Sequence, residues 1–480
     1  MKKHITEQTV IFFSVVKWVF LSSFVGVVIG AVVTLFLKIL KYSENSREFL
    51  PFEYYYLLPF ALVATIWLIK KFAPSAEGHG TEKVIEAVHK NYGKIDVKVI
   101  PIKTFATVLT IFAGGSVGKE GPGAQIGAGV SSLLSTIFNF SKEDRKKLVI
   151  CGISAGFATV FGTPIAGAIF GVEVLVIGVI FYDVLLPSFI AGFAAFTTAQ
   201  LLGVHYTYYD IRYYENISLD LVLIFKVVIA GIIFGVISDF VITTVSRVHK
   251  LIKKIELSNY LKAFIAGVVI ILLTKIFGEH YIGLGLEEIK SSLVSHDNGL
   301  PWYAFILKTF FTAITLGAGG SGGIITPIFY IGATSGHTVG SILSPEHVEL
   351  FAALGFTSVV AATTNAPIAA TIMAVELFGL DIAHYAAISA VMSFLLSGHR
   401  SIFPSQILAM KKSDIVCVDM GKEIENAEVD VETNKIIKVN KDKMKLLQRR
   451  IKIQRERAKK RKKRNIVKRV KKLSKDKKSN

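Results

Sequence analysis

The sequence predicts an all-α polytopic membrane protein, built from two related halves with broken helices. Two observations carry this prediction. Hydrophobic residues make up 52% of the 480-residue chain, with a mean hydropathy of +0.52. Glycine-rich segments also interrupt the apolar sequence at matching places about 205 residues apart. Such interruptions in two hydrophobic halves indicate broken helices that meet near the middle of the membrane.

Apolar stretches long enough for membrane helices run through most of the first 400 residues. A bilayer core needs about 20 apolar residues per helix. Several stretches are longer and contain glycine or proline, so each should hold more than one helix. The first is too long for a signal peptide and no A-x-A-like site follows it, so we expect it to remain as a membrane helix. The stretches lie near residues 9–40, 55–72, 97–114, 147–203, 219–245, 261–277, 301–332 and 350–397.

Two elements of the sequence repeat in the same order, which predicts related halves at about residues 15–205 and 219–410 of a transmembrane domain spanning 1–410. The first element is glycine-rich, and the second is a proline followed nine residues later by glutamate. The paired copies are Ala113–Pro122 with Ala318–Pro327, and Gly162-Thr163-Pro164…Glu173 with Asn365-Ala366-Pro367…Glu376.

A polar linker (411–440) and a basic tail (441–480) follow this domain. The tail holds 21 Lys and Arg against three acidic residues, so it carries 18 of the net +19 charges. We expect it to be cytoplasmic, as a solvated charge run or bound to anionic lipid. It lacks the pattern of an RNA-binding module, so only non-specific attraction to nucleic acid is expected.

The residues that enzymes and metal sites need are sparse. Cys151 and Cys417 form no disulfide framework, and the eleven histidines include no H-E-x-x-H or other ligand pair at helical spacing. We therefore expect no enzyme, no metal and no cofactor, although a tethering role through the basic tail stays open.

The glycine-rich segment Gly114–Pro122 precedes an apolar helix and predicts an anion site. Glycine backbone at a helix start exposes N–H groups, and the helix N-terminus adds about half a positive charge. The spacing does not fit a nucleotide-binding P-loop. Other glycines fit close helix packing instead, namely Gly123, Gly127, Gly332, Gly336 and Gly340.

Glu120 lies inside this segment and is the predicted gate. An ionisable group at membrane depth is by default functional, since burying it costs at least about 2.5 kcal/mol. Facing amides would offset that cost, so the carboxylate can occupy the place of an anion and leave when protonated or displaced. A structural glutamate paired with Lys119 or with another helix is the alternative.

Gly118-Lys119-Glu120-Gly121-Pro122 resembles the gating motif of the CLC family of chloride channels and chloride/proton exchangers, and Gly322–Pro327 is similar to its second anion loop. The resemblance spans about residues 15–410. It implies a homodimer in the plasma membrane with one anion pathway per subunit. Each subunit would be an inverted-repeat bundle of tilted and broken helices with cytoplasmic termini. It further implies that the anion meets the backbone amides of Ile324 and Ile325 beside Gly118, Lys119 and Gly121.

The first anion loop of the family corresponds to Gly78-His79-Gly80-Thr81-Glu82, so His79 replaces the usual serine. The imidazole can donate an N–H to the anion, or it can turn into the vestibule. We expect the helix Thr81–Lys90 to begin here with capping chemistry and to point Gly80 and its N-terminus at the site.

Two more departures concern the inner end of the pathway. Phe403 takes the place of the pore-lining tyrosine, as a constriction or as ordinary packing. In Gly171–Leu175, Glu173 matches a structural glutamate and Val174 replaces the inner proton acceptor of exchangers. Glu173 and Glu376 should then be buried, hydrogen-bonded helix residues.

We therefore expect a passive, Glu120-gated chloride channel, with a proton-coupled chloride antiporter as the alternative. Fluoride-selective relatives usually replace the proline of the gating motif, whereas Pro122 is retained, so fluoride is less favoured. The chain after Leu408 is too short for the paired CBS module of many relatives.

Overall fold

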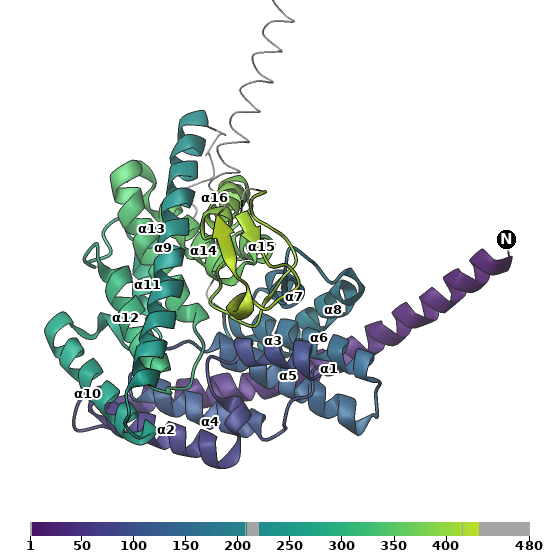
Figure 1. The fold of residues 1–480 in the computed structure, drawn as a ribbon, viewed down its shortest axis with the longest axis horizontal. Helices are drawn as coiled ribbons and strands as arrows, with labels where there is room; N and C mark the ends of the chain where they lie inside the picture. Colours follow the sequence, from purple (N-terminus) through teal and green to yellow (C-terminus); the bar gives the residue numbers. More distant parts are fainter. Residues whose placement is uncertain (1, 207, 209–219, 415, 432–480) are drawn as a thin grey trace, which may run out of the picture. The chain divides into compact units, whose positions relative to one another are not determined.

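The computed structural model describes residues 2–206, 208, 220–414 and 416–431. They fall into two compact units (Figure 1). The larger comprises Met1–Met410 and Met420–Ala427. In the smaller, β3 (Val416–Val418) and β4 (Val429–Val431) pair antiparallel. The predicted basic tail and the end of the predicted linker lie outside the described residues.

The larger unit contains two successive sets of helices of matching order. The first set is α1 (Lys2–Asn45), α2 (Leu58–Phe72), α3 (Thr81–Lys90), α4 (Val99–Phe112), α5 (Glu120–Ile137), α6 (Lys142–Phe161), α7 (Pro164–Glu173) and α8 (Tyr182–Leu201). The second set is α9 (Leu221–Lys254), α10 (Asn259–Phe277), α11 (Leu286–Val294), α12 (Ala304–Gly317), α13 (Ile325–Leu343), α14 (Val348–Thr364), α15 (Pro367–Phe378) and α16 (Ala383–Leu396). Two short strands, β1 (Val176–Ile177) and β2 (Ile407–Leu408), pair in parallel.

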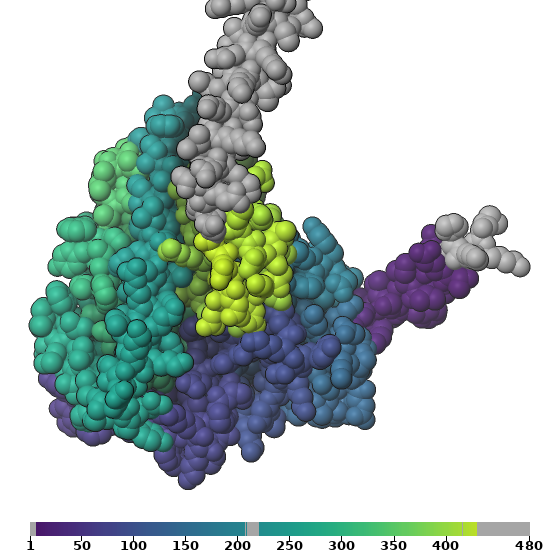
Figure 2. Space-filling view, viewed as in Figure 1, coloured from purple at the N-terminus to yellow at the C-terminus, as the bar shows by residue number. Residues whose placement is uncertain are grey.

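Six helical segments of the described chain are long and apolar enough to cross a membrane. Large apolar side chains along α1 are exposed, including Phe13 (67%) and Phe20 (72%), and its N-terminal part projects away from the other helices (Figure 2). Such side chains suit contact with lipid rather than water. The segments are Thr6–Phe49, Tyr54–Phe72, Tyr182–Leu201, Leu221–Lys254, Asn259–Phe277 and Pro345–Thr364.

Glycines bring helices into contact within each half, as the small-residue spacing predicts. A Cβ on Gly127 of α5 would overlap the carbonyl oxygen of Gly152 on α6, and one on Gly332 of α13 would overlap that of Gly355 on α14. The backbones can approach this closely only because side chains are missing. The packing role of these glycines is confirmed.

The helices break at equivalent places in the two halves. Gly162 (φ +75°) ends α6 and Asn365 (φ +55°) ends α14, both in the left-handed conformation that terminates helices. Pro164 and Pro367 then start α7 and α15, since proline suits the first helical position.

The glutamates of the repeated element cap each other's halves. Each carboxylate accepts hydrogen bonds from two backbone amides in the first turn of the corresponding helix of the other half. Glu376 accepts from Ile165 (3.0 Å) and Ala166 (2.7 Å), and Glu173 accepts from Ile368 (3.1 Å) and Ala369 (2.7 Å). Both glutamates are hydrogen-bonded helix residues, as predicted, but only Glu173 is buried, whereas Glu376 is half-buried. Their reciprocal contacts join α7 to α15.

A second contact that recurs in both halves was not predicted. Lys103 of α4 and Lys308 of α12 are both fully buried, and each ammonium donates to two carbonyl oxygens of the loop before the amphipathic helix of its own half. The acceptors are Ala76 (3.1 Å) and Gly78 (2.5 Å) for Lys103, and Tyr281 (3.2 Å) and Gly283 (3.0 Å) for Lys308. The lysines thus hold these loops in place.

Replacing Glu376 by alanine should destabilise the fold, because the amides of Ile165 and Ala166 lose their acceptor at a cost of about 1–3 kcal/mol for each unsatisfied donor. The midpoint of thermal unfolding in detergent should fall by several degrees. Asp381→Ala, which removes an exposed carboxylate three residues beyond α15, is the matched control. A midpoint for Glu376→Ala equal to that of the control would contradict the capping role.

Candidate functional site

The two glycine-rich segments meet in a short antiparallel pairing. The amide of Gly118 donates to the carbonyl oxygen of Gly323 at 2.6 Å, and the amide of Gly323 donates back to Gly118 at 2.6 Å. Residues 205 positions apart in the sequence thus form one element. Their glycines are required, since a Cβ on Gly118 would overlap the hydroxyl of Thr326.

Helices α5 and α13 begin directly after this pairing. Their N-cap residues, Lys119 (φ −103°, ψ −14°) and Ile324 (φ −103°, ψ −13°), have nearly the same backbone conformation. Each helix start leaves backbone N–H groups without intrahelical partners and carries partial positive charge. The pairing therefore places two electropositive helix ends beside each other in a buried region.

Glu120 is buried, with 2% of its surface exposed, and its carboxylate crosses from one half to the other. One oxygen accepts from the amide of Thr326 at 3.1 Å and from the Thr326 hydroxyl. The carboxylate of α5 thus occupies the N-terminus of α13, where an anion would be stabilised. These hydrogen bonds to another helix fit the structural alternative as well as the gate.

Thr326 is a site residue that the sequence reasoning missed. It follows Ile324 and Ile325 in the repeated segment, whose backbone amides the family resemblance assigns to the anion. A hydroxyl in the first turn of a helix that faces an anion site is the signal that could have found it. All three residues are at most 1% exposed.

The first anion loop lies against this arrangement. A Cβ on Gly121 would overlap the carbonyl oxygen of His79, and one on Gly80 would overlap that of Gly121, so the loop and the start of α5 pack backbone to backbone. The His79 side chain is half-buried, and its Nδ1 atom is buried without a hydrogen-bond partner in the described chain. The ring therefore keeps an unused polar atom.

The predicted capping of α3 is wrong in detail. The helix spans Thr81–Lys90 as expected, but its N-cap is Gly80 (φ +82°) and no side chain caps it. Thr81 is already the first helical residue, and its hydroxyl has no partner among the described residues. A capping hydroxyl must precede the helix, whereas the positive φ at that position requires glycine.

Phe403 is fully buried, and its ring centroid lies 6.0 Å from that of His79. Its amide donates to the Ser401 hydroxyl at 2.9 Å. The two rings close one side of the region next to the first anion loop. This contact suits a constriction as well as packing.

A buried network of hydrogen bonds centred on Gln406 includes the carbonyl oxygen of Val174, the residue at the position where exchangers carry a carboxylate. Gln406 donates to the carbonyl oxygens of Val174 (2.6 Å) and Thr364 (2.8 Å), and it accepts from Ser401 (2.5 Å) and Asn365 (3.3 Å). Every hydrogen bond named here joins groups that do not titrate near neutral pH. Sequence reasoning missed Gln406, because nothing local links it to α7.

Two facing helix starts and a buried carboxylate between the halves of an inverted-repeat membrane bundle define a membrane transport protein. Residues 60–398 match the family model described as voltage gated chloride channel. The chain therefore belongs to the CLC family of anion-transport proteins and is an integral, multi-pass membrane protein.

Relatives and a solved structure agree. A chloride/fluoride channel protein of Pseudomonas syringae pv. tomato is 35% identical over 410 residues, which cover 83% of this chain and 88% of the relative. The H⁺/Cl⁻ exchange transporter ClcA of Vibrio vulnificus is 26% identical, with 75% and 81% covered. A crystal structure of a CLC-type fluoride/proton antiporter superimposes with a TM-score of 0.77 at 30% identity, covering 83% of this chain and 99% of that one. The predicted family and fold are confirmed.

Thr326→Val should loosen Glu120, because it removes the hydroxyl donor but keeps the backbone amide and the side-chain shape. A hydrogen bond to a charged group contributes about 1.5–3 kcal/mol, so an anion should displace the carboxylate more readily. The anion concentration that gives half-maximal flux from proteoliposomes should fall about tenfold, which corresponds to about 1.4 kcal/mol. Thr326→Ser should resemble the wild type. An unchanged half-saturation in the valine variant would exclude this role of the hydroxyl.

Proposed function

We propose that this protein exchanges a halide ion for protons across the membrane, with Glu120 acting as both the gate and a proton carrier. The observation that carries the proposal is the position of the Glu120 carboxylate on the Thr326 amide and hydroxyl at the start of α13. A carboxylate and a halide compete for the same donors, so one enters as the other leaves. Protonation weakens the hold of the carboxylate on these donors.

Competition at one place is the physical basis of coupling. When a halide occupies the helix start, the Glu120 side chain must lie elsewhere, where it can gain or lose a proton. When the halide leaves, the deprotonated carboxylate returns to the positive helix end. Movement of the two ions in opposite directions then follows from alternate occupation.

Relatives favour exchange over the passive channel expected from the sequence. A V. vulnificus relative is named as a proton/chloride exchange transporter, and the structure with a TM-score of 0.77 is a fluoride/proton antiporter. The channel expectation rested on Val174 and Phe403. Exchange without a carboxylate at Val174 requires another inner proton route, formed by water or by a different side chain.

Chloride is the proposed substrate, and fluoride is the second candidate. Fluoride appears in the names of the relative at 35% identity and of the structure at 30% identity, although Pro122 is retained. The donors around Glu120 are backbone amides and a hydroxyl. Such donors bind either halide, so flux with each ion must be compared.

The other residues of the pathway keep the roles expected from the family. In this proposal the amides of Ile324 and Ile325 bind the anion with the backbone of Gly118, Lys119 and Gly121, while His79, Gly80 and Phe403 line the inner side. The protein acts as a homodimer in the plasma membrane with cytoplasmic termini, and its basic tail meets anionic lipid.

The reversal potential of the purified protein in proteoliposomes tests the exchange. Under opposed halide and pH gradients, the potential should move away from the halide equilibrium value in the direction set by the pH gradient. The measurement is repeated with chloride and with fluoride, and protein-free liposomes are the control. Reversal at the halide equilibrium potential at every pH gradient would establish a passive channel instead.

Glu120→Gln should separate halide movement from proton movement. The amide side chain has nearly the same size but carries neither the negative charge nor the proton. Halide flux should persist and lose most of its dependence on pH, whereas halide-driven proton uptake, followed with a pH-sensitive dye, should disappear. Glu143→Gln, in the exposed first turn of α6, should retain both. Proton uptake by Glu120→Gln at the wild-type rate would overturn the assignment.

A further inference from the structure

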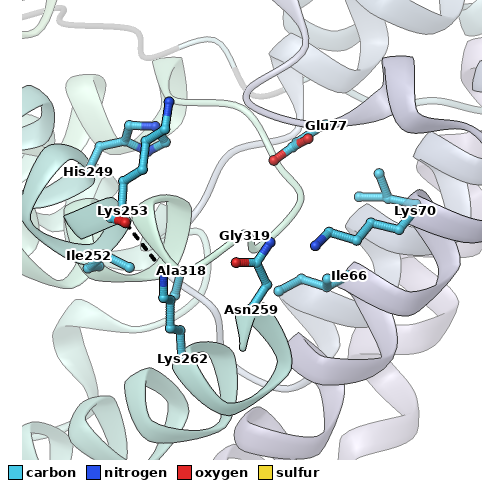
Figure 3. Close-up of a pocket in the computed structure, with 12 residues that line it drawn as sticks. Ile66, Lys70, Glu77, His249, Ile252, Lys253, Asn259, Lys262, Ala318 and Gly319 are labelled. Carbon is cyan, nitrogen blue, oxygen red and sulfur yellow. Dashed lines mark hydrogen bonds between the residues drawn. The ribbon is translucent and has the colours of Figure 1, made fainter. Parts of the chain in front are cut away.

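A cavity of about 290 Å³, whose lining does not include Glu120, lies where five segments of the larger unit meet. Its walls are the C-terminal ends of α2 and α9, the first turn of α10, Glu77 of the loop before α3, and Gly317–Gly319 at the end of α12 (Figure 3). Sequence reasoning did not single out this region, because its walls come from residues more than 200 positions apart.

Lysines supply most of the charged groups of the lining. Lys70, Lys253 and Lys262 line the cavity together with His249 and a single carboxylate, that of Glu77. Figure 3 shows Lys70 reaching from α2 toward the start of α10. Three ammonium groups beside one carboxylate leave a net positive charge, which predicts an anionic occupant.

The contacts of these lysines within the described chain leave their charges available to a ligand. Lys70 lies 5.7 Å from the centroid of the Tyr260 ring, and Lys262 donates to the carbonyl oxygen of Lys253 at 3.4 Å (Figure 3). Within the described chain, none of the three forms an ion pair with a carboxylate. Lys70 and Lys253 are exposed to solvent, so a soluble ligand can reach them.

The first turn of α10 adds to the positive field. This 19-residue helix starts at Asn259, which lines the cavity, and Ser258 accepts from only one of its first amides, that of Leu261. The helix N-terminus favours an anion, and here it reinforces the charge of the lysines. The excess of lysine at the cytoplasmic ends of membrane helices favours a cytoplasmic position for this cavity.

We propose that this cavity is a regulatory site for a phosphate group, carried by a soluble phosphate ester or by a lipid headgroup. Lysine is a common binder of phosphate as a point charge, and the volume is at the lower end of small-ligand sites, which start at about 300 Å³. A single halide ion needs neither this volume nor three ammonium groups. Binding at this site does not depend on which halide is transported or on proton coupling.

A continuous stretch of backbone links the wall of the cavity to the anion site, which gives a bound ligand a way to change transport. Gly317–Gly319 continues into the segment whose Gly323 pairs with Gly118. Gly319 has φ +93°, and a Cβ there would lie 2.8 Å from the Ile66 side chain, so the segment packs tightly against α2. A ligand that draws the lysines together shifts the wall of the cavity and the pairing beyond it.

The test uses the full chain with three cavity lysines replaced, Lys70→Gln, Lys253→Gln and Lys262→Gln. The matched control replaces three lysines of the same region that do not line the cavity: Lys71→Gln, Lys250→Gln and Lys254→Gln. Lys71 lies over the rings of Trp67 and Phe72. Both variants lose the same charge and keep the basic tail, so non-specific attraction of phosphate is equal in both.

Pyrophosphate is titrated calorimetrically against the protein in neutral-lipid nanodiscs, and halide flux is measured in phosphatidylcholine liposomes with pyrophosphate or with added phosphatidic acid. Wild type and control should bind pyrophosphate saturably, and the cavity variant at least tenfold more weakly. Flux should respond to pyrophosphate if the source is soluble, or to phosphatidic acid alone if it is a headgroup. Only the cavity variant should lose the response.

Three results would overturn the proposal: equal loss of binding in both variants, no effect of either phosphate source on wild-type flux, or complete competition between pyrophosphate and halide, which would make the cavity the entrance of the halide pathway. If the triple variant does not fold, Lys253→Gln alone, at an exposed position, decides in the same way. Halide flux of each variant is compared with that of the wild type in the absence of phosphate, which shows whether the variant still transports.

Discussion

The backbone pairing of Gly118 with Gly323 is the interaction on which the candidate site depends, because it joins the two glycine-rich segments. This pairing sets the starts of α5 and α13 beside each other, and each start carries unsatisfied N–H groups and partial positive charge. In a membrane interior such groups need an internal partner, because no water is available to them. The site is therefore built to require a negative charge, and Glu120 supplies one.

In the proposed mechanism, the Glu120 carboxylate binds the donors that an external anion would use and so blocks the site when no anion is bound. Glu120 belongs to α5 but is bonded to Thr326 in the other half. Its displacement by an external anion breaks a contact between the two halves. Gating by a side chain of this kind needs no large movement of helices, because the exchange of one negative charge for another leaves the surrounding donors satisfied.

Charged side chains are held by backbone groups at other places in the structure as well. Glu173 and Glu376 cap helices of opposite halves, while Lys103 and Lys308 hold loops of their own halves. Each of these four charged groups thus meets backbone dipoles instead of an opposite charge. Charged groups that are satisfied by the backbone stabilise broken helices at membrane depth, where the freed amides and carbonyls would otherwise be costly.

The sequence by itself determined the helices, the repeat and the carboxylate that we propose as the gate, because these follow from hydrophobic length, from glycine and proline at fixed positions, and from a lone carboxylate in an apolar segment. The span of α3 and the structural role of Glu173 were predictable on this basis. Local reasoning failed for α3 only at its cap, where the backbone conformation of Gly80 replaces a side chain.

Only the tertiary structure decided which distant groups meet. Thr326 holds Glu120 across 206 residues of sequence, and Gln406 donates to the carbonyl oxygen of Val174 across 232 residues. The lysines that line the cavity come from three helices. No periodicity or spacing encodes such contacts, since they depend on how whole helices pack. The sequence therefore predicted which residues are chemically competent, while the packing of the two halves selected the partners that make them act.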